Sequence, residues 1–114
     1  MIYIITVKNE ELKVLNLSWN KITGNGAAAI GYALAKNSDL HVLNVSWNGL
    51  EEGGAHALAH GLDSNESLKE LDITANRLGQ CGLAKLLKGL KENTTLETLK
   101  VDIQFVMKET NKKL

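Results

Sequence analysis

The chain lacks several features that characterise whole classes of protein. Its 114 residues include no proline and one cysteine, Cys81, so no internal disulfide can form. The aromatic residues are few (two Trp, two Tyr and one Phe), and thirteen basic side chains balance thirteen acidic ones. Because a chain without net charge lacks the basic excess that phosphate binding requires, we do not expect nucleic acid as a ligand.

Long apolar segments are also missing. No run approaches the roughly 18 apolar residues of a membrane span. The segment 1–8 has too short an apolar run for a signal peptide, and no basic residue precedes that run. We therefore predict no membrane association and a cytoplasmic location. The hydrophobic fraction of 44% and the charged fraction of 23% are typical of a soluble folded protein, and the length suits one domain.

What the sequence does contain is a recurring pattern of leucine and asparagine. The stretch from Leu12 to Ile22 reads L-x-x-L-x-L-x-x-N-x-I, and Leu40–Leu50 and Leu68–Leu78 repeat it with conservative changes. A fourth copy begins at Leu96, so the copies start at residues 12, 40, 68 and 96, which are 28 apart. Recurrence at one fixed period indicates a protein built from stacked repeats.

The hydrophobic period changes inside each copy. Leu43 and Val45 alternate with polar neighbours, which predicts a half-buried strand. Glycines in 23–26, 52–54 and 79–82 then predict a turn. A helical period follows, as in the second copy, where Ala55, Leu58 and Leu62 line one face. Each unit is therefore expected to be strand, turn, helix and loop.

One such unit cannot enclose its own leucines, so neighbouring units must stack. We predict an α/β fold, a right-handed β-α superhelix forming a short arc of about three full repeats, with the parallel sheet concave and the helices convex. Residues 1–114 are expected to form a single domain. Its predicted parts are a remnant or N-terminal cap (1–11), three full repeats (12–39, 40–67 and 68–95), and a partial repeat with a C-terminal cap (96–114).

A 28-residue repeat with a glycine-rich turn and a full helix resembles the ribonuclease-inhibitor-like class of leucine-rich repeat proteins. The phrases Leu-Asn-Leu-Ser-Trp-Asn (15–20) and Leu-Asn-Val-Ser-Trp-Asn (43–48) are most similar to intracellular members of that class without an assigned activity. The resemblance implies a non-catalytic scaffold that binds another protein. One member of the class activates the GTPase Ran, so a small-GTPase regulator is an alternative. A truncated fragment with little independent function is another.

Two asparagine series share the 28-residue spacing. Asn20, Asn48 and Asn76 follow the strands, and we expect their amides to turn inward and bond backbone groups at the bend. This series is predicted to be a structural ladder. A second series closes each repeat, three residues before the next leucine start: Asn37, Asn65 and Asn93.

The side chains between the buried leucines are predicted to point out of the concave face and to contact the partner. They are Val14, Asn16, Ser18, Trp19, Val42, Asn44, Ser46, Trp47, Glu70, Asp72 and Thr74. The two tryptophans occupy equivalent positions and are candidates for an interface hot spot. The alternative is that each ring packs on its own ascending turn and covers the edge of the core.

No combination of residues indicates catalysis or a cofactor. His56 and His60 have the one-turn spacing that can chelate zinc, but Ala57 stands where a metalloprotease carries glutamate. We interpret the two histidines as surface residues and predict no metal site. Cys81 has no histidine or basic residue adjacent in sequence, so nothing indicates an activated thiol. We predict that the protein is not an enzyme.

The two ends of the stack are expected to differ. Residues 104–114 are predicted to fold over the C-terminal end as a cap. The N-terminal end carries apolar side chains without polar cover, namely Ile2, Ile4 and Ile5. An uncovered apolar end can dock another copy, so self-association through the solenoid ends is possible.

Overall fold

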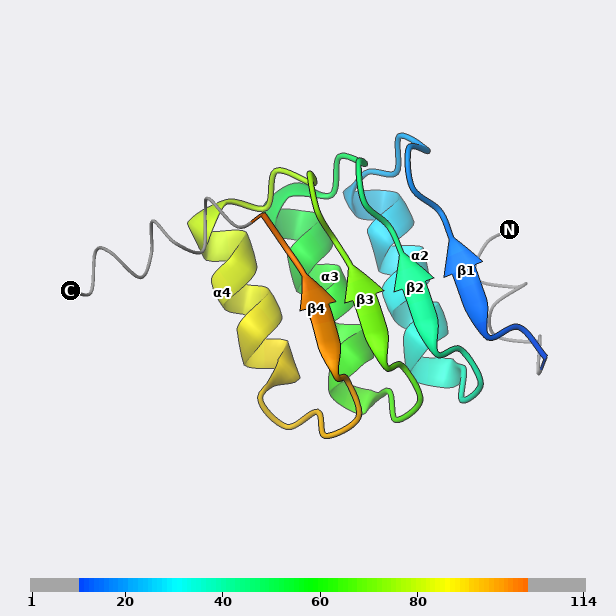
Figure 1. Ribbon diagram of the computed structural model, residues 1–114. Helices are drawn as coiled ribbons and strands as arrows, with labels where there is room; N and C mark the ends of the chain where they lie inside the picture. The colour runs from blue at the N-terminus through cyan, green and yellow to red at the C-terminus, as the bar shows by residue number, and fades with distance from the viewer. Residues whose placement is uncertain (1–10, 103–114) are drawn as a thin grey trace.

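A computed structural model describes residues 11–102 of the chain, and the expectations for 1–10 and 103–114 fall outside this range (Figure 1). Strands and helices alternate along the described residues. In chain order they are β1 (Val14–Asn16), α2 (Gly24–Lys36), β2 (Val42–Asn44), α3 (Glu51–Ser64), β3 (Glu70–Asp72), α4 (Gly79–Leu90) and β4 (Thr98–Lys100). Each strand–helix unit therefore coincides with one copy of the leucine pattern.

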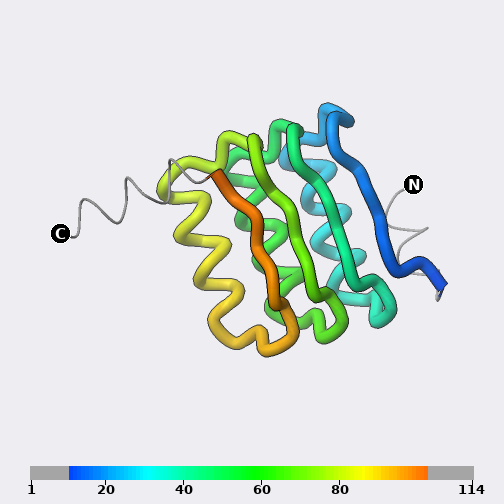
Figure 2. The backbone as a smooth tube through the Cα atoms, viewed as in Figure 1, coloured from blue at the N-terminus to red at the C-terminus, as the bar shows by residue number. Residues whose placement is uncertain are grey.

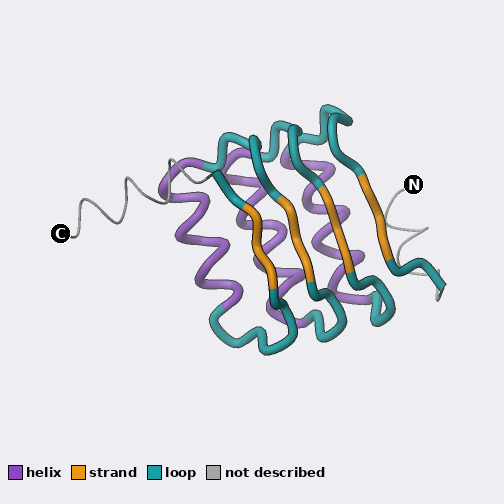
Figure 3. Tube along the Cα trace, viewed as in Figure 1, coloured by secondary structure: helices purple, strands orange, loops and turns teal. Residues whose placement is uncertain are grey.

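The four strands form one parallel sheet in the order β1-β2-β3-β4. The register joins each residue to the one 28 positions later, so Leu15 pairs with Leu43, Leu43 with Leu71, and Leu71 with Leu99. Helices α2, α3 and α4 lie on the same side of this sheet (Figures 1 and 3). Sheet and helices thus form two layers, and the predicted α/β repeat fold is confirmed.

The core lies between the two layers. Strand residues Leu43 and Leu71 are almost completely buried, and Leu34, Leu58 and Leu86 meet them from the three helices. The leucines of the outer strands, Leu15 and Leu99, are only partly buried. Burial is therefore deepest in the two middle units, as expected when each unit completes its core against its neighbours.

The glycines that predicted turns lie instead in the first turns of the helices, so that prediction was wrong. The chain reverses earlier, where Trp19 and Trp47 adopt positive φ angles of 60° and 56°. The glycines are needed for close packing. A Cβ on Gly54 would lie 2.6 Å from the Leu50 Cβ atom, so only glycine fits beneath the turn.

Further glycines let the helices approach one another. A Cβ on Gly61 of α3 would overlap the Gly31 carbonyl of α2. In the same way, a Cβ on Gly89 of α4 would lie 2.6 Å from the Ala59 Cβ atom of α3. The helix layer is therefore held together by backbone-to-backbone contact at these points.

Asn76 lies inside the bend that follows β3 and is completely buried. Its Nδ2 donates to the carbonyl oxygens of Val45 (2.9 Å), Ile73 (3.0 Å) and Thr74 (3.3 Å). Its Oδ1 accepts from the backbone N–H groups of Asn48 (3.2 Å) and Leu50 (3.4 Å) of the preceding unit. One side chain therefore satisfies backbone groups of two units, which would otherwise be buried without partners.

Asn48 makes the same kind of contacts one unit earlier. Its Oδ1 accepts from the N–H groups of Asn20 (2.8 Å) and Ile22 (3.0 Å), and its Nδ2 donates to the Leu17 carbonyl (3.0 Å). Asn20 is exposed, and its Nδ2 donates to the Ser18 carbonyl of its own unit (3.0 Å). Identical motif residues thus carry different numbers of inter-unit bonds.

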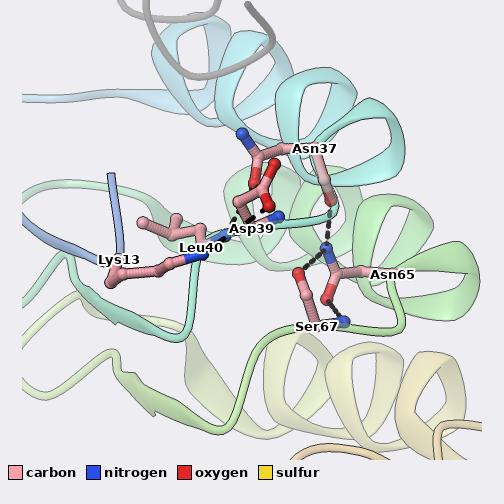
Figure 4. Close-up of polar contacts among 6 residues, drawn as sticks. All are labelled: Lys13, Asn37, Asp39, Leu40, Asn65 and Ser67. Atoms are coloured by element: carbon pink, nitrogen blue, oxygen red, sulfur yellow. Dashed lines mark hydrogen bonds and ion pairs between the residues drawn. The ribbon is translucent and has the colours of Figure 1, made fainter. Parts of the chain in front are cut away.

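The second asparagine series joins the units at the opposite end of the helices (Figure 4). The Asn65 Nδ2 donates to the carbonyls of Leu34 (2.8 Å) and Asn37 (3.1 Å) in the preceding unit. Its Oδ1 accepts from the N–H groups of Ser67 (3.0 Å) and Leu68 (2.7 Å). Neighbouring units are therefore cross-linked by buried carboxamides at both ends of the helices, by Asn48 and Asn76 at one end and by Asn65 at the other.

Candidate functional site

The outer face of the sheet collects the predicted contact residues into rows. The four strands run side by side in one direction (Figure 2). Their register places equivalent residues next to one another across the sheet. One row joins Val14, Val42 and Glu70, and the next begins with Asn16 and Asn44. Exposure is uneven along these rows. Val14 is 61% exposed, whereas Val42 and Glu70 are half-buried.

The asparagines in the second row serve the fold as well as the surface. The Asn16 Oδ1 accepts from the Ser18 N–H (2.9 Å) and Oγ (2.7 Å), and the Asn44 Oδ1 accepts from Ser46 at the same two distances. These bonds orient each carboxamide at the strand end. Within residues 11–102, no acceptor is seen for either Nδ2 group, so both donors can serve a partner.

Asp72 continues this row with a carboxylate. Its Oδ1 accepts from the Thr74 N–H (3.0 Å), the contact that the asparagines make in the units before it. Beside it, the Glu70 carboxylate lies 3.1 Å from the Lys100 Nζ atom. The face therefore changes from neutral amides at β1 and β2 to charged groups at β3 and β4.

Trp19 and Trp47 form the most exposed apolar feature of the face. Their ring centres lie 4.4 Å apart and their planes differ by 6°, so the rings are stacked. The two side chains remain 69% and 51% exposed. Each ring therefore packs on the other rather than into the core, and much of the aromatic surface stays available to a partner.

The backbone at this position is set by the repeat. Ala75 occupies the equivalent place in the third unit and has a φ of 58°, close to the values at both tryptophans. Positive φ is uncommon outside glycine, so all three units hold the same unfavoured conformation. The repeat therefore determines the backbone conformation at this position, and in the first two units the side chain there is a tryptophan.

The remaining predicted residues are less accessible. Ser46 is buried, with 6% of its surface exposed, and Ser18 and Thr74 are half-buried. Of the predicted contact residues, Trp19, Trp47, Val14 and Asn16 are therefore the most accessible to a partner. The stacking was not predicted from the sequence, although two tryptophans 28 residues apart, each in the turn after its strand, are the signal for it.

Other kinds of site find little support. Among residues 11–102, no group of three or more His, Cys, Asp or Glu side chains is placed to hold a metal ion. The described helices are all too short or too polar to cross a bilayer. Cys81 is exposed on α4 with its thiol free.

The repeated strand–helix arrangement is also found in known proteins. A family model described as Leucine Rich repeat matches residues 8–31, 36–59 and 64–87. The chain belongs to the leucine-rich repeat family. The three matched segments correspond to the three successive strand–helix units, and they cover more than half of this leucine-rich repeat chain.

Solved structures give a closer comparison. The domain described as "Leiomodin-1 Actin-Binding Site 2 (ABS2)" superposes with a TM-score of 0.85 and 26% sequence identity. The match covers 97% of this chain and 65% of that one, so the leucine-rich repeat chain spans just under two thirds of the leiomodin structure. A search of curated proteins found no match.

A more distant structure shares the fold alone. It is the tropomodulin C-terminal domain of Caenorhabditis elegans, with a TM-score of 0.61 and 10% identity. The match covers 96% of this chain and 87% of that domain. The strand–helix repeat is therefore common to all three chains.

Proposed function

We propose that this leucine-rich repeat chain is a non-catalytic, cytoplasmic protein-binding module of the ribonuclease-inhibitor-like class. The partner contacts the concave sheet, with the stacked Trp19 and Trp47 as its anchor. The supporting observation is that the turns after β1 and β2 hold two exposed, stacked aromatic rings, near two amide donors for which residues 11–102 provide no acceptor. Aromatic side chains dominate binding energies at protein interfaces, and their rigid rings lose little entropy on binding.

Actin is the partner that we propose to test first. The support is the match to the leiomodin-1 domain, which is named for an actin-binding site, over 97% of the chain at a TM-score of 0.85. Function resides in particular side chains rather than in a fold, so the proposal depends on the exposed residues of the sheet. It predicts that actin contacts the tryptophan pair and the adjacent Asn16 and Asn44.

Binding measurements with monomeric and with filamentous actin test this proposal. We expect the purified chain to bind at least one form in titration or co-sedimentation. Trp47→Ala is expected to weaken binding by at least about tenfold, which corresponds to about 1.4 kcal/mol. Leu87→Ala is the matched control, because Leu87 on α4 is 51% exposed like Trp47 but lies in the helix layer.

The outcomes test separately whether actin is the partner and whether the concave face is its binding site. If neither form of actin binds, actin is rejected as the partner. If actin binds equally well to the wild type and to Trp47→Ala, the concave face is rejected as its site. If Leu87→Ala weakens binding instead, the helix layer is the interface.

A further inference from the structure

The helix layer carries a second group of residues that the protein-binding face does not use. A hollow of about 390 Å³ opens between α3 and α4. It is lined by His56, Ala59, His60, Asp63, Lys85, Lys88 and Gly89. Two of these residues, Ala59 and Gly89, are where α3 and α4 approach closely. The two imidazoles are the chemically distinctive groups in this hollow.

His56 and His60 are both exposed and lie one turn apart on α3. Their ring centres are 4.8 Å apart, with an angle of 82° between the ring planes. This edge-to-face separation also falls within the range that two imidazoles on one metal ion would have. With metal–nitrogen bonds of about 2.05 Å and ring centres about 1.1 Å beyond each nitrogen, two imidazoles at about 90–110° have centres about 4.5–5.2 Å apart.

The sequence alone predicted surface histidines and no metal site, but with the two rings this close we propose that His56 and His60 form a two-histidine chelate for a divalent late transition metal, with Cu²⁺ bound more tightly than Zn²⁺. Imidazole nitrogen is a good ligand for these ions, whereas Mg²⁺ and Ca²⁺ prefer oxygen. Because residues 11–102 offer no cluster of three such ligands, water completes the coordination. The helix backbone places the two side chains one turn apart on the same face, and their rotamers bring the rings to this separation without a bound ion.

The charges around the hollow are compatible with a cation. The Lys85 Nζ atom lies 2.9 Å from a Glu52 carboxylate oxygen, so its charge is largely balanced. Asp63, one turn beyond His60, adds a negative charge to the lining. Lys88 is exposed, and its long flexible side chain can extend into solvent away from a bound ion.

Metal binding would act on the fold through α3. Linking His56 to His60 fixes one turn of the helix whose inner face contributes Leu58 and Leu62 to the core. An ion that binds the folded chain and not the unfolded one raises its stability by mass action. We therefore expect the thermal unfolding midpoint to rise with added Zn²⁺ or Cu²⁺ and not with Mg²⁺.

The repeats themselves supply suitable substitutions. The positions equivalent to His56 are Ala28 and Ala84, and the position equivalent to His60 in the first unit is Tyr32. His56→Ala and His60→Tyr therefore introduce side chains that neighbouring units already accommodate. Two variants serve as controls by removing the remaining histidine and the cysteine, namely His41→Ala and Cys81→Ser.

Calorimetric titration of the untagged full chain with ZnCl₂, and separately with CuCl₂, tests the proposal. We expect one ion per chain, a Cu²⁺ affinity above that for Zn²⁺, and a loss of at least about tenfold in affinity in each histidine variant. His41→Ala and Cys81→Ser should bind like the wild type. In NMR spectra of the wild type, Zn²⁺ should shift the imidazole signals of His56 and His60 and leave those of His41 in place.

The NMR result does not depend on how well any variant folds. Absence of stoichiometric binding would overturn the proposal, as would equal affinity for Ca²⁺. Loss of binding in Cys81→Ser or His41→Ala with retention in His56→Ala would place the ion elsewhere and would also overturn it.

Discussion

Trp19 and Trp47 stack with their ring centres 4.4 Å apart and their planes within 6° of parallel. Neighbouring strands in a sheet are about 4.7–4.9 Å apart. Equivalent side chains on adjacent units are therefore separated by nearly the distance at which two aromatic rings stack. The repeat geometry therefore produces the stack directly. Ala75 holds the same positive φ in the third unit, so we expect Trp19→Ala to remove one ring of the stack and to keep the backbone conformation.

The stack is expected to contribute measurable coupling energy. Aromatic pairs gain about 0.5–1.5 kcal/mol beyond the burial of their surface. Urea unfolding of Trp19→Ala, Trp47→Ala and the double variant should reveal a coupling of that size. If the two single effects simply add, the rings do not stack in solution.

Buried and exposed members of the first asparagine series should differ sharply in their effect on stability. Asn76→Ala leaves several buried backbone groups without partners, and each such group costs about 1–3 kcal/mol, so we expect a total loss of about 3 kcal/mol or more. Asn20→Ala removes one exposed bond and should cost about 0.5 kcal/mol or less.

Chemical denaturation of the two variants provides the measurement. Each serves as the control for the other, because the residue type and the motif position are the same. Similar losses in both variants would show that the inter-unit bonds of Asn76 do not determine its contribution.

The sequence was sufficient to predict the repeat, the strand register and the leucines of the core. These follow from the spacing, because residues 28 apart must pair when identical units stack. The positions of Gly54 and Gly82 in the helices were missed, because local turn propensity was given more weight than close packing. The 4.8 Å separation of His56 and His60 depends on side-chain rotamers, which a helical spacing alone does not fix.

The ion pair between Glu70 and Lys100 offers a test that separates recognition from stability. The N···O distance is 3.1 Å, and the two side chains are 36% and 54% exposed, so solvent screens the attraction. Glu70→Gln should therefore change the free energy of unfolding by less than about 1 kcal/mol. If the concave face binds actin, the same variant should change the affinity or its salt dependence.

A loss of stability well above that limit in Glu70→Gln would show that the pair supports the fold. Unchanged affinity at low and high salt would exclude β3 from the interface. A substitution of Lys13 serves as the control, because its ion pair with Asp39 (3.6 Å) lies away from β3 and β4.

Two glycines of α3 should respond in opposite directions to the same substitution. Gly61→Ala would drive a Cβ into the Gly31 carbonyl, and a backbone atom cannot move aside as a flexible side chain can. We expect a loss of about 1–3 kcal/mol, the usual cost of overpacking. A Cβ on Gly53 would meet nothing within 4 Å, so Gly53→Ala should stabilise the helix by up to about 1 kcal/mol.

Thermal unfolding followed by circular dichroism compares the two variants directly. A lower midpoint for Gly61→Ala together with a higher one for Gly53→Ala would establish that contact between α2 and α3, rather than helix propensity, selects glycine at position 61. Stabilisation by both substitutions would contradict the close helix packing.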